Sequence, residues 1–331
     1  MARLERYIQN SLPGNKGAKI FNDIPGHTPP TLRKGRTNRI LLFNGCFNPP
    51  HRGHLALLEH TFHDCGEDLN VIAAVVLVAS EEFLQWKFRR QSRDLHLSDQ
   101  QRIRLWDGEL GRANWCLACP EDQWWEVSAK LKLDLARDGF EVDFVRVAGG
   151  DKIHRAGQAH GQWGCRTLIT SDVCRRVDFF EDGEAPVVLR NHGPWRKVEV
   201  GEDILREQAR QRALHSRSPE GTVTGEETSL DITQSNPVED DALTARIQEE
   251  YLRSLSLVNK RRLWICDCTS NSRGYTLRFI ASDDRLSPDF SSTNLRNIIA
   301  YTALGELEDK LQGVALSPGL LTRFILDRYG I

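Results

Sequence analysis

The chain has 331 residues, 40% of them hydrophobic and 27% charged, which is ordinary for a globular protein with one enlarged domain or two smaller ones. Its formal net charge of −2 gives no global indication of a nucleic-acid partner. The longest apolar run, residues 71–79, has the length of a strand and falls far short of the ~20 residues that cross a membrane.

The eight cysteines include a C-x-x-C at Cys116 and Cys119 and a C-x-C at Cys266 and Cys268, and no flanking histidine has the spacing of a zinc site. We expect buried, reduced thiols in a cytosolic protein. The N-terminus lacks the hydrophobic core of a secretory signal, and Glu5 interrupts its mild basic character. A cytoplasmic or nuclear location is therefore expected, and a mitochondrial presequence is the less favoured alternative.

In chain order, residues 1–38 predict an irregular lead-in, because prolines and an arginine cluster at 33–39 oppose a packed element. Strands and helices then alternate along the chain. The apolar runs predict strands at 40–43, 71–79, 115–118, 142–147, 168–169 and 263–266, with helices at 55–62, 95–110 and 124–135. This order implies an α/β fold with a doubly wound parallel sheet, in which ligands bind at the carboxyl ends of the strands.

Residues 216–241 interrupt this pattern. They are rich in serine, threonine and glutamate, contain no aromatic residue, and include Pro219 and Pro237. Such a composition predicts a disordered insertion. Helical periodicity returns over residues 241–257.

A first motif follows the first strand and opens a helix. It reads Gly45-Cys46-Phe47-Asn48-Pro49-Pro50-His51-Arg52-Gly53-His54. A helix N-terminus offers free N–H groups to a phosphate, and glycines let the backbone approach a ligand closely. His51 and His54 are three residues apart, so both rings can face the same way and donate hydrogen bonds to phosphate oxygens.

At these residues the chain resembles the nucleotidyltransferase superfamily with the H-x-G-H signature. The F-N-P form looks like the nicotinamide-mononucleotide adenylyltransferases, although eukaryotic members of that family often carry threonine where this chain has His51. The resemblance implies a Rossmann-like domain over residues 39–331, interrupted by an insertion at about 194–261 and closed by a C-terminal helical extension. Class I aminoacyl-tRNA synthetases, which share a related histidine motif, also need a K-M-S-K-S loop that has no counterpart here.

A second motif, residues 290–296, precedes a helical run near the C-terminus. It reads Phe290-Ser291-Ser292-Thr293-Asn294-Leu295-Arg296. Serine and threonine are good N-cap residues, and an arginine one turn into the helix can reach the same phosphate oxygens. S-S-T-x-x-R also resembles the C-terminal motif of these adenylyltransferases, which favours ATP over CTP.

Further positions acquire roles through the resemblance. Gly149 and Asp151 fall where the family places the ribose and base of the nucleotides. Trp125, which precedes Glu126, and Trp163 resemble the tryptophans that stack on the nicotinamide ring. Lys87 falls where the family has a lysine near the substrate phosphates. One departure concerns the strand at 168–169, which is followed by Ser171 and Asp172 instead of a Gly-Arg pair and so leaves the acceptor-phosphate contact unassigned.

The resemblance thus implies three groups of site residues. The catalytic group is His51, His54 and Arg296. The ATP-binding group is Gly45, Cys46, Phe47, Gly53, Gly149, Asp151, Ser291, Ser292 and Thr293. The acceptor-binding group is Asn48, Lys87, Trp125 and Trp163. No metal-ligating side chain is implied, since Mg²⁺ would be held mainly by the phosphates.

We therefore predict an enzyme of NAD biosynthesis that transfers AMP from ATP to nicotinamide or nicotinate mononucleotide by in-line attack, without a covalent enzyme intermediate. Its expected partners are these two nucleotides, with neither nucleic acid nor membrane, and homo-oligomerisation is left open. One alternative is a related transferase for another phosphate ester, such as phosphopantetheine or phosphocholine. The other alternative is a nucleotide-binding regulator without catalytic activity.

Overall fold

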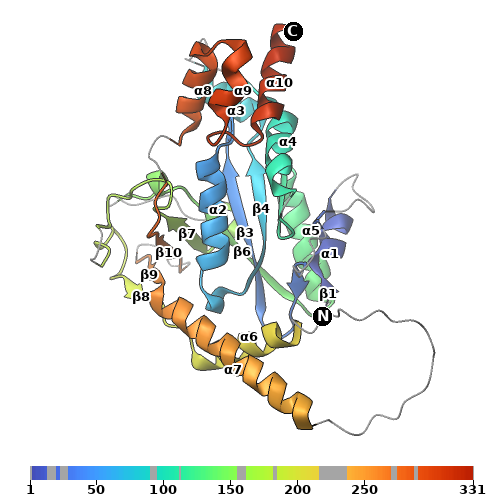
Figure 1. Ribbon diagram of the computed structural model, residues 1–331, viewed down its shortest axis with the longest axis vertical. Helices are drawn as coiled ribbons and strands as arrows, with labels where there is room; N and C mark the ends of the chain where they lie inside the picture. The colour runs from blue at the N-terminus through green and yellow to red at the C-terminus, as the bar shows by residue number, and fades with distance from the viewer. Residues whose placement is uncertain are drawn as a thin grey trace, which may run out of the picture. The chain divides into compact units, whose positions relative to one another are not determined.

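A computed structural model describes residues 2–12, 20–22, 29–89, 95–111, 113–154, 162–181, 185–215, 237–269, 274–286 and 290–330 (Figure 1). The chain divides into two compact units. The first contains Met1–Cys65, Leu69–Lys197 and Arg262–Ile331, and the second contains Gly66–Asp68 and Val198–Arg261. No helix within the described ranges is long and apolar enough to cross a membrane.

The first unit is built on an eight-stranded sheet with the order β5-β4-β3-β6-β7-β10-β9-β8. Its strands are β3 (Thr37–Gly45), β4 (Val71–Val78), β5 (Cys116–Pro120), β6 (Glu141–Val147), β7 (Thr167–Ser171), β8 (Arg196–Lys197), β9 (Arg262–Asp267) and β10 (Thr276–Ala281). All pairings from β5 to β10 are parallel, whereas β9 is antiparallel to both of its neighbours. The predicted doubly wound parallel sheet is thus confirmed, with a mixed edge that the sequence pattern did not predict.

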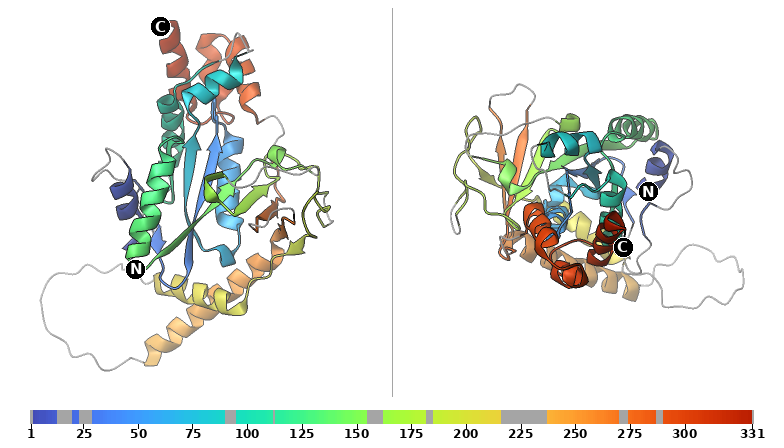
Figure 2. Two further views of the ribbon diagram at one scale, coloured as in Figure 1. Left: turned by 180° about the vertical axis from the view of Figure 1, so that it is seen from behind. Right: turned by 90° about the horizontal axis from the view of Figure 1, so that it is seen from above.

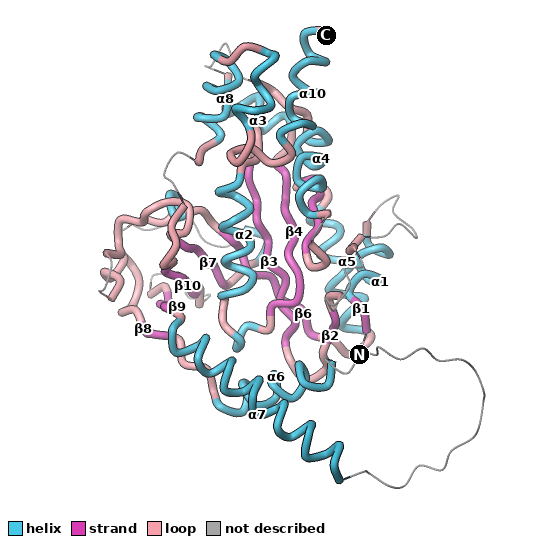
Figure 3. Tube along the Cα trace, in the orientation of Figure 1, coloured by secondary structure: helices cyan, strands magenta, loops and turns pink. Residues whose placement is uncertain are grey.

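The strand order reverses direction between β3 and β6, because β4 follows β3 on one side and β6 returns on the other. The connecting helices are α2 (Arg52–Asp64), α3 (Glu81–Phe88), α4 (Asp99–Leu110) and α5 (Trp124–Arg137). Right-handed crossovers place α2 and α4 on one face and α5 on the other (Figures 1 and 2). The carboxyl ends of β3 and β4 point toward α3, as Figure 3 also shows.

Alternating strand residues form the core beneath α5. Ile40 and Leu42 of β3 and Phe144 of β6 pack with Trp124 and Leu131 of α5. Residues of the opposite parity, such as Phe43, face the other side, where Phe43 meets the α4 tryptophan Trp106 with ring centroids 6.3 Å apart. Strand β4 is buried along most of its length, as its valine-rich sequence predicts for a central strand.

The N-terminal segment differs from the irregular lead-in expected for residues 1–38. Helix α1 (Leu4–Ser11) packs against α5, and β1 (Ala2–Arg3) pairs with β2 (Thr31–Leu32). The physical reason is an amphipathic spacing, since Leu4, Tyr7 and Ile8 share one buried face while the prolines that suggested irregularity lie beyond the helix. The Tyr7 hydroxyl also donates a 2.7 Å hydrogen bond to Asp138.

The C-terminal extension contains α8 (Ser292–Tyr301), the 3₁₀ turn η4 (Leu304–Glu306), α9 (Leu307–Leu311) and α10 (Pro318–Tyr329). Leu295, Leu311 and Phe324 pack into one apolar cluster with Leu105 of α4. The predicted C-terminal helical extension is therefore present, and packing against α4 makes it part of the first unit.

The second unit consists mainly of α6 (Glu202–His215) and α7 (Pro237–Lys260), which pack against each other. Arg212 donates to the Ser254 hydroxyl at 3.0 Å, and Arg261 forms a 2.7 Å ion pair with Glu67. This unit overlaps the insertion expected at about 194–261. Of the segment predicted to be disordered, residues 216–236 lie outside the described residues, whereas residues 237–241 begin α7 and are helical.

Candidate functional site

A cavity of about 620 Å³ opens at the carboxyl ends of the strands, next to the reversal between β3 and β6. Its wall includes most of the predicted site residues. They are Gly45, Cys46, Phe47, Asn48, His51, His54, Lys87, Gly149, Asp151, Ser291, Ser292, Thr293 and Arg296. Segments separated by about 250 positions, the first motif and the second, thus meet in one site.

Three predicted residues do not line this cavity. Gly53 lies beneath it, where an added Cβ would come within 3.0 Å of the Phe290 Cβ and 3.1 Å of the His51 ring. This glycine therefore lets α2 approach the second motif closely. Trp163 is buried in the core beneath α5, and Trp125 is 61% exposed on the surface of α5. Their prediction as stacking residues for the acceptor is revised accordingly.

The tryptophan result follows from helix geometry. Trp124, Val127, Leu131 and Leu135 recur at helical spacing and form the buried face of α5. Trp125 is one position, or about 100°, further around the helix and so faces solvent. The apolar spacing already present in the sequence could have identified Trp124 as the core residue of the pair.

His51 and His54 form the centre of the cavity wall. Their rings stack with centroids 3.5 Å apart and planes inclined by 24°. His51 is the N-cap of α2, and its main-chain N–H donates to Nδ1 of His54 at 3.2 Å. Because that Nδ1 accepts, a neutral His54 carries its proton on Nε2.

Both imidazoles are neutral near pH 7. Burial, with a smaller contribution from the Arg175 charge, lowers the pKa of His51 to about 3. Burial also lowers the pKa of His54 well below its usual value, and the charges of His51, Arg175 and Lys87 act in the same direction. The pair therefore offers hydrogen bonds instead of fixed positive charge until an anion binds.

The loop between β3 and α2 is held through its carbonyl groups. Arg102 donates to the Cys46 carbonyl at 2.7 Å, Arg296 to the Asn48 carbonyl at 2.9 Å, and the Ser292 hydroxyl to the Pro49 carbonyl at 2.9 Å. The Leu316 N–H completes the set by donating to the Pro50 carbonyl at 3.3 Å. Donors from α4, α8 and the segment before α10 therefore determine the position of this loop.

The side chain of Asn48 also contributes to this arrangement. It is buried, accepts a hydrogen bond from the Leu97 N–H at 3.1 Å and donates to the Leu95 carbonyl. Phe47 packs edge-on against His54 with ring centroids 4.9 Å apart. Gly45 makes room for that ring, since an added Cβ would lie 2.8 Å from Phe47 Cζ.

In the second motif, Ser291 is the N-cap of α8, and its hydroxyl accepts from the Asn294 N–H at 3.0 Å. Arg296 donates to the Thr293 hydroxyl at 3.2 Å and places its guanidinium 4.9 Å from the centre of the Phe88 ring. Arg296 thereby connects α8, α3 and the first loop. Lys87 of α3 reaches the same loop, with its Nζ 3.4 Å from Cys46 Sγ.

The cavity wall also contains charged residues that sequence reasoning did not assign to the site. They are Glu121, Arg146, Lys152 and Arg175. Glu121 and Arg175 follow the parallel strands β5 and β7, Arg146 is the penultimate residue of β6, and Lys152 belongs to the 3₁₀ turn η2 (Gly150–Lys152). Their position at the ends of strands was the sequence signal that could have identified them. With Lys87 and Arg296, five cationic side chains line the cavity against the two carboxylates of Glu121 and Asp151.

Asp151 is surrounded by two of these cations. Its carboxylate lies 2.7 Å from Lys152 Nζ and 3.6 Å from Arg175 Nη1. Burial alone would raise the pKa of Asp151, but the Lys152 hydrogen bond and the charges of Lys152 and Arg175 lower it overall. Asp151 is therefore a charged hydrogen-bond acceptor at neutral pH.

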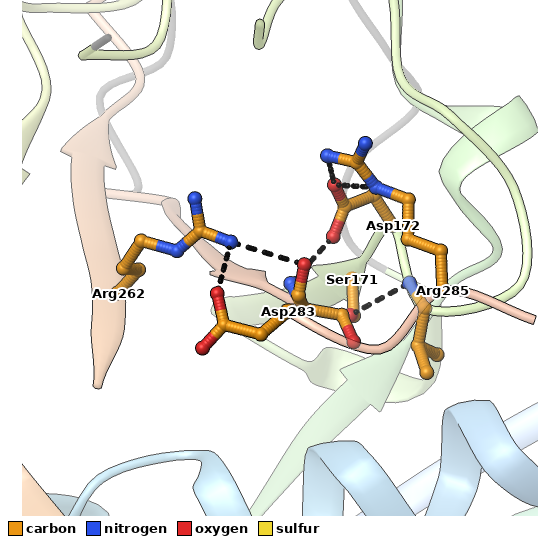
Figure 4. A network of polar contacts seen from close by, with 7 residues as sticks. Ser171, Asp172, Arg262, Asp283 and Arg285 are labelled. Atoms are coloured by element: carbon orange, nitrogen blue, oxygen red, sulfur yellow. Dashed lines mark hydrogen bonds and ion pairs between the residues drawn. The ribbon is translucent and has the colours of Figure 1, made fainter. Parts of the chain in front are cut away.

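A polar network fixes the segment that carries Arg175 (Figure 4). Asp172, which is buried, accepts from the Ser282 N–H at 2.7 Å and from Arg285 Nε at 2.8 Å. Arg262 in turn donates to the Asp283 carboxylate at 2.6 Å. The aspartate that replaces the expected Gly-Arg pair after β7 thus joins the ends of β7 and β10.

Within the described residues, no group of three or more His, Cys, Asp or Glu side chains has an arrangement that could hold a metal ion.

Comparison with known proteins identifies a related region. Residues 42–156 match the cytidylyltransferase-like family, and this region contains the histidine loop and the Gly149–Asp151 segment. Over 152 residues the chain is also 27% identical to the bifunctional protein HldE of Proteus mirabilis (strain HI4320), a match that covers 45% of this chain but only 30% of that protein. Both matches support the nucleotidyltransferase superfamily and an activity of that kind.

Proposed function

We propose that this protein is an adenylyltransferase that joins AMP from ATP to a pyridine mononucleotide, forming a dinucleotide and releasing pyrophosphate. The observation that carries the proposal is the meeting of two helix N-termini in one cationic cavity. The α2 terminus presents His51 and His54, and the α8 terminus presents Ser291 to Thr293 with Arg296. Helix N-termini bind phosphates, and five cations against two carboxylates favour a polyanionic ligand.

In this proposal the triphosphate of ATP lies between the two helix termini. A phosphate oxygen of the acceptor attacks the α-phosphorus and forms the new P–O bond. The bond from the α-phosphorus to the bridging oxygen breaks, and its electron pair leaves with pyrophosphate. The protein needs no nucleophile, because positioning and charge stabilisation are sufficient for phosphoryl-type transfer.

The two histidines would stabilise the charge that develops on the phosphate oxygens. His54, with its proton on Nε2, can donate from that nitrogen. Binding of the triphosphate next to these imidazoles would raise their pKa values toward neutrality, because nearby negative charge favours the protonated form. Arg296 and Lys87 would contact the outer phosphates.

A magnesium ion fits this site as part of the nucleotide. Among the residues that the structure describes, the cavity wall offers the carboxylates of Glu121 and Asp151 but no group of three or more possible metal ligands. When bound, Mg²⁺ neutralises phosphate charge and polarises the reacting phosphorus.

The pyridine acceptor is favoured by the resemblance of both motifs to one adenylyltransferase family. The tryptophans expected to stack on its ring do not line the cavity, whereas Phe43, Phe47 and two phenylalanines of α3 do. Phe83 and Phe88 both line the cavity, and Phe83 is 48% exposed. An electron-poor ring can stack on such residues.

The cytidylyltransferase-like match keeps a second candidate open, a transferase of the same superfamily that uses CTP or another phosphate-ester acceptor. The test is pyrophosphate release by the purified protein with Mg²⁺ and either ATP or CTP. The acceptors are nicotinamide mononucleotide, nicotinate mononucleotide, phosphopantetheine and phosphocholine. Release with ATP and a pyridine mononucleotide is expected, whereas release only with another pair would replace the proposed substrate.

A pair of histidine variants makes this test specific for the site. His54→Ala should reduce turnover by about 10² or more, as loss of one preorganised transition-state donor does in other enzymes. His63→Ala, an exposed histidine in the last turn of the same helix, serves as the matched control. Equal turnover of the two variants would remove His54 from the mechanism.

A further inference from the structure

Arg146 is a charged residue in an unusual position. It belongs to β6, a strand in the interior of the sheet, and it shares the face of Phe144, which packs in the core beneath α5. Its side chain is half-buried and lines the cavity. Its Nε is buried and has no hydrogen-bond partner among the residues that the structure describes.

A buried Nε without an acceptor is costly in this position. Burial disfavours the charged form of Arg146 and lowers its pKa, although Cys165 and Glu121 act in the opposite direction. Arginine nevertheless stays protonated in proteins, so an acceptor that binds this Nε relieves the cost. The side chain lines a cavity that admits ligands, and a bound ligand is therefore the natural source of that acceptor.

Glu121 is the complementary group. It follows β5 and is two residues beyond Cys119, so its side chain continues the alternation of Leu117 and Cys119. It therefore lies on the face of the sheet that is covered by α5, as Arg146 does. Both side chains line the same cavity, and each influences the pKa of the other without an ion pair between them. Burial is the main cause of the raised pKa of Glu121.

The spacing of the strands explains why the two side chains do not touch. Strands β4 and β3 lie between β5 and β6, which separates their backbones by roughly 14 Å at ~4.8 Å per strand. The intervening wall is formed by Ala79 and Asn44, which have the same parity and also line the cavity. A donor and an acceptor thus face each other across a gap with small residues between them.

We infer that Arg146 and Glu121 form the subsite for the acceptor ring and recognise a carboxamide on it. The Arg146 guanidinium donates to the amide oxygen, and the Glu121 carboxylate accepts from the amide nitrogen. A carboxylate in the same place satisfies Arg146 but meets the like charge of Glu121. This inference rests on the proposed function and selects nicotinamide mononucleotide over nicotinate mononucleotide.

The location supports an acceptor rather than the triphosphate. The histidines are on the other side of the sheet edge, where His54 lies 6.2 Å from the ring of Phe43, a residue of opposite parity to Leu42. Arg146 and Glu121 are on the Leu42 side, away from the α2 N-terminus. We therefore assign the acceptor ring, and not the triphosphate, to this wall.

The test compares kcat/KM for the amide and acid mononucleotides in the same protein preparation. The wild type should prefer the amide by at least about tenfold. This ratio corresponds to the free energy of about one hydrogen bond to a charged group. Glu121→Gln removes the like charge and should move the ratio toward the acid by about tenfold. Arg146→Met should lower kcat/KM for both acceptors, and Arg146→Lys should restore part of it.

The control is Asp122→Asn, which removes a neighbouring exposed carboxylate that does not line the cavity. A ratio unchanged by Glu121→Gln, or changed equally by Asp122→Asn, would overturn the inference while leaving the adenylyltransferase proposal intact. Absence of turnover with both mononucleotides, in wild-type protein that still binds ATP, would overturn both. Because the ratio is measured within one variant, partial unfolding cancels from it.

Discussion

The guanidinium of Arg102 in α4 donates a 2.7 Å hydrogen bond to the main-chain carbonyl of Cys46, in the loop that leads to the two histidines. Its Nε donates to the carbonyls of Leu97 and Ser98 at 3.1 and 3.2 Å. Arg102 is fully buried, so its hydrogen bonds to these three carbonyls are shielded from water. The Arg102 side chain thus hydrogen-bonds the loop that forms the cavity wall to α4.

The first prediction concerns this attachment. Arg102→Leu should lower the free energy of unfolding by about 3 kcal/mol, since buried carbonyls lose their donor, and should weaken ATP binding. Denaturant unfolding and ATP titration measure the two effects. Arg104→Leu, an exposed position on the same helix, should change stability by less than about 0.5 kcal/mol. Similar losses in both variants would contradict a specific role for Arg102.

The second prediction is a pH dependence of stability. The folded-state pKa of His51, about 3, and that of His54 are lowered by burial relative to the unfolded value near 6.5. Below pH 6.5 the unfolded chain therefore binds more protons than the native protein, and stability falls as the pH decreases. Between pH 7 and pH 5 His51 should cost about 2 kcal/mol, and the lowered pKa of His54 acts in the same direction.

The measurement is the unfolding free energy of the ligand-free protein at these two pH values. The double variant His51→Gln with His54→Gln should lose most of the dependence that the pair causes. His63→Ala should retain it, because that histidine is exposed. If the double variant kept the full slope, the imidazoles would not be buried in their neutral form.

The third prediction separates two adjacent tryptophans. Trp124 is fully buried on the inner face of α5, and Trp124→Ala should destabilise the protein by about 3–5 kcal/mol. Trp125→Ala should have less than about 1 kcal/mol of effect and leave the KM of the acceptor unchanged. Thermal or denaturant unfolding and acceptor titration provide the comparison. An increase in acceptor KM in Trp125→Ala alone would restore its predicted stacking role.

The fourth prediction concerns Arg296, which binds the Asn48 carbonyl and the Thr293 hydroxyl. Under the proposed function, Arg296→Ala should lower kcat/KM for ATP by about 10², because it removes a phosphate contact and loosens the histidine loop. Arg296→Lys should recover little, since its single nitrogen cannot take the places of both guanidinium nitrogens that donate here. Arg323→Ala, an exposed arginine of α10, should behave as wild type.

The sequence predicted the parts of the fold that depend on local patterns. The run Val71 to Ala79 identified a central strand, and the glycines and histidines after the first strand identified a helix N-terminus at the sheet edge. Both follow from spacing and residue type alone. The predicted meeting of residues 45–54 with residues 291–296 required the family resemblance, since nothing local connects them.

The features that sequence reasoning missed depend on tertiary contacts. Helix α1 has an amphipathic spacing, but it is only eight residues long and is stabilised by packing on α5, a tertiary contact. Arg146 resembles an ordinary charged residue until the strand order shows that it lies inside the sheet. Ser292 was predicted to contact phosphate, yet its hydroxyl donates to the Pro49 carbonyl, a partner 243 residues away.

The histidine loop is held by donors from α8 and from Leu316, and this has a consequence for synthesis of the protein. The hydrogen bond between Arg296 and the Asn48 carbonyl spans 248 residues. At roughly 5–20 residues per second, a ribosome needs about 12 to 50 seconds to add that stretch. During this interval the nascent chain can pair its first parallel strands while the histidine loop still lacks its donors from α8 and from Leu316. The cavity wall is therefore completed only after residues 292–316 have been translated.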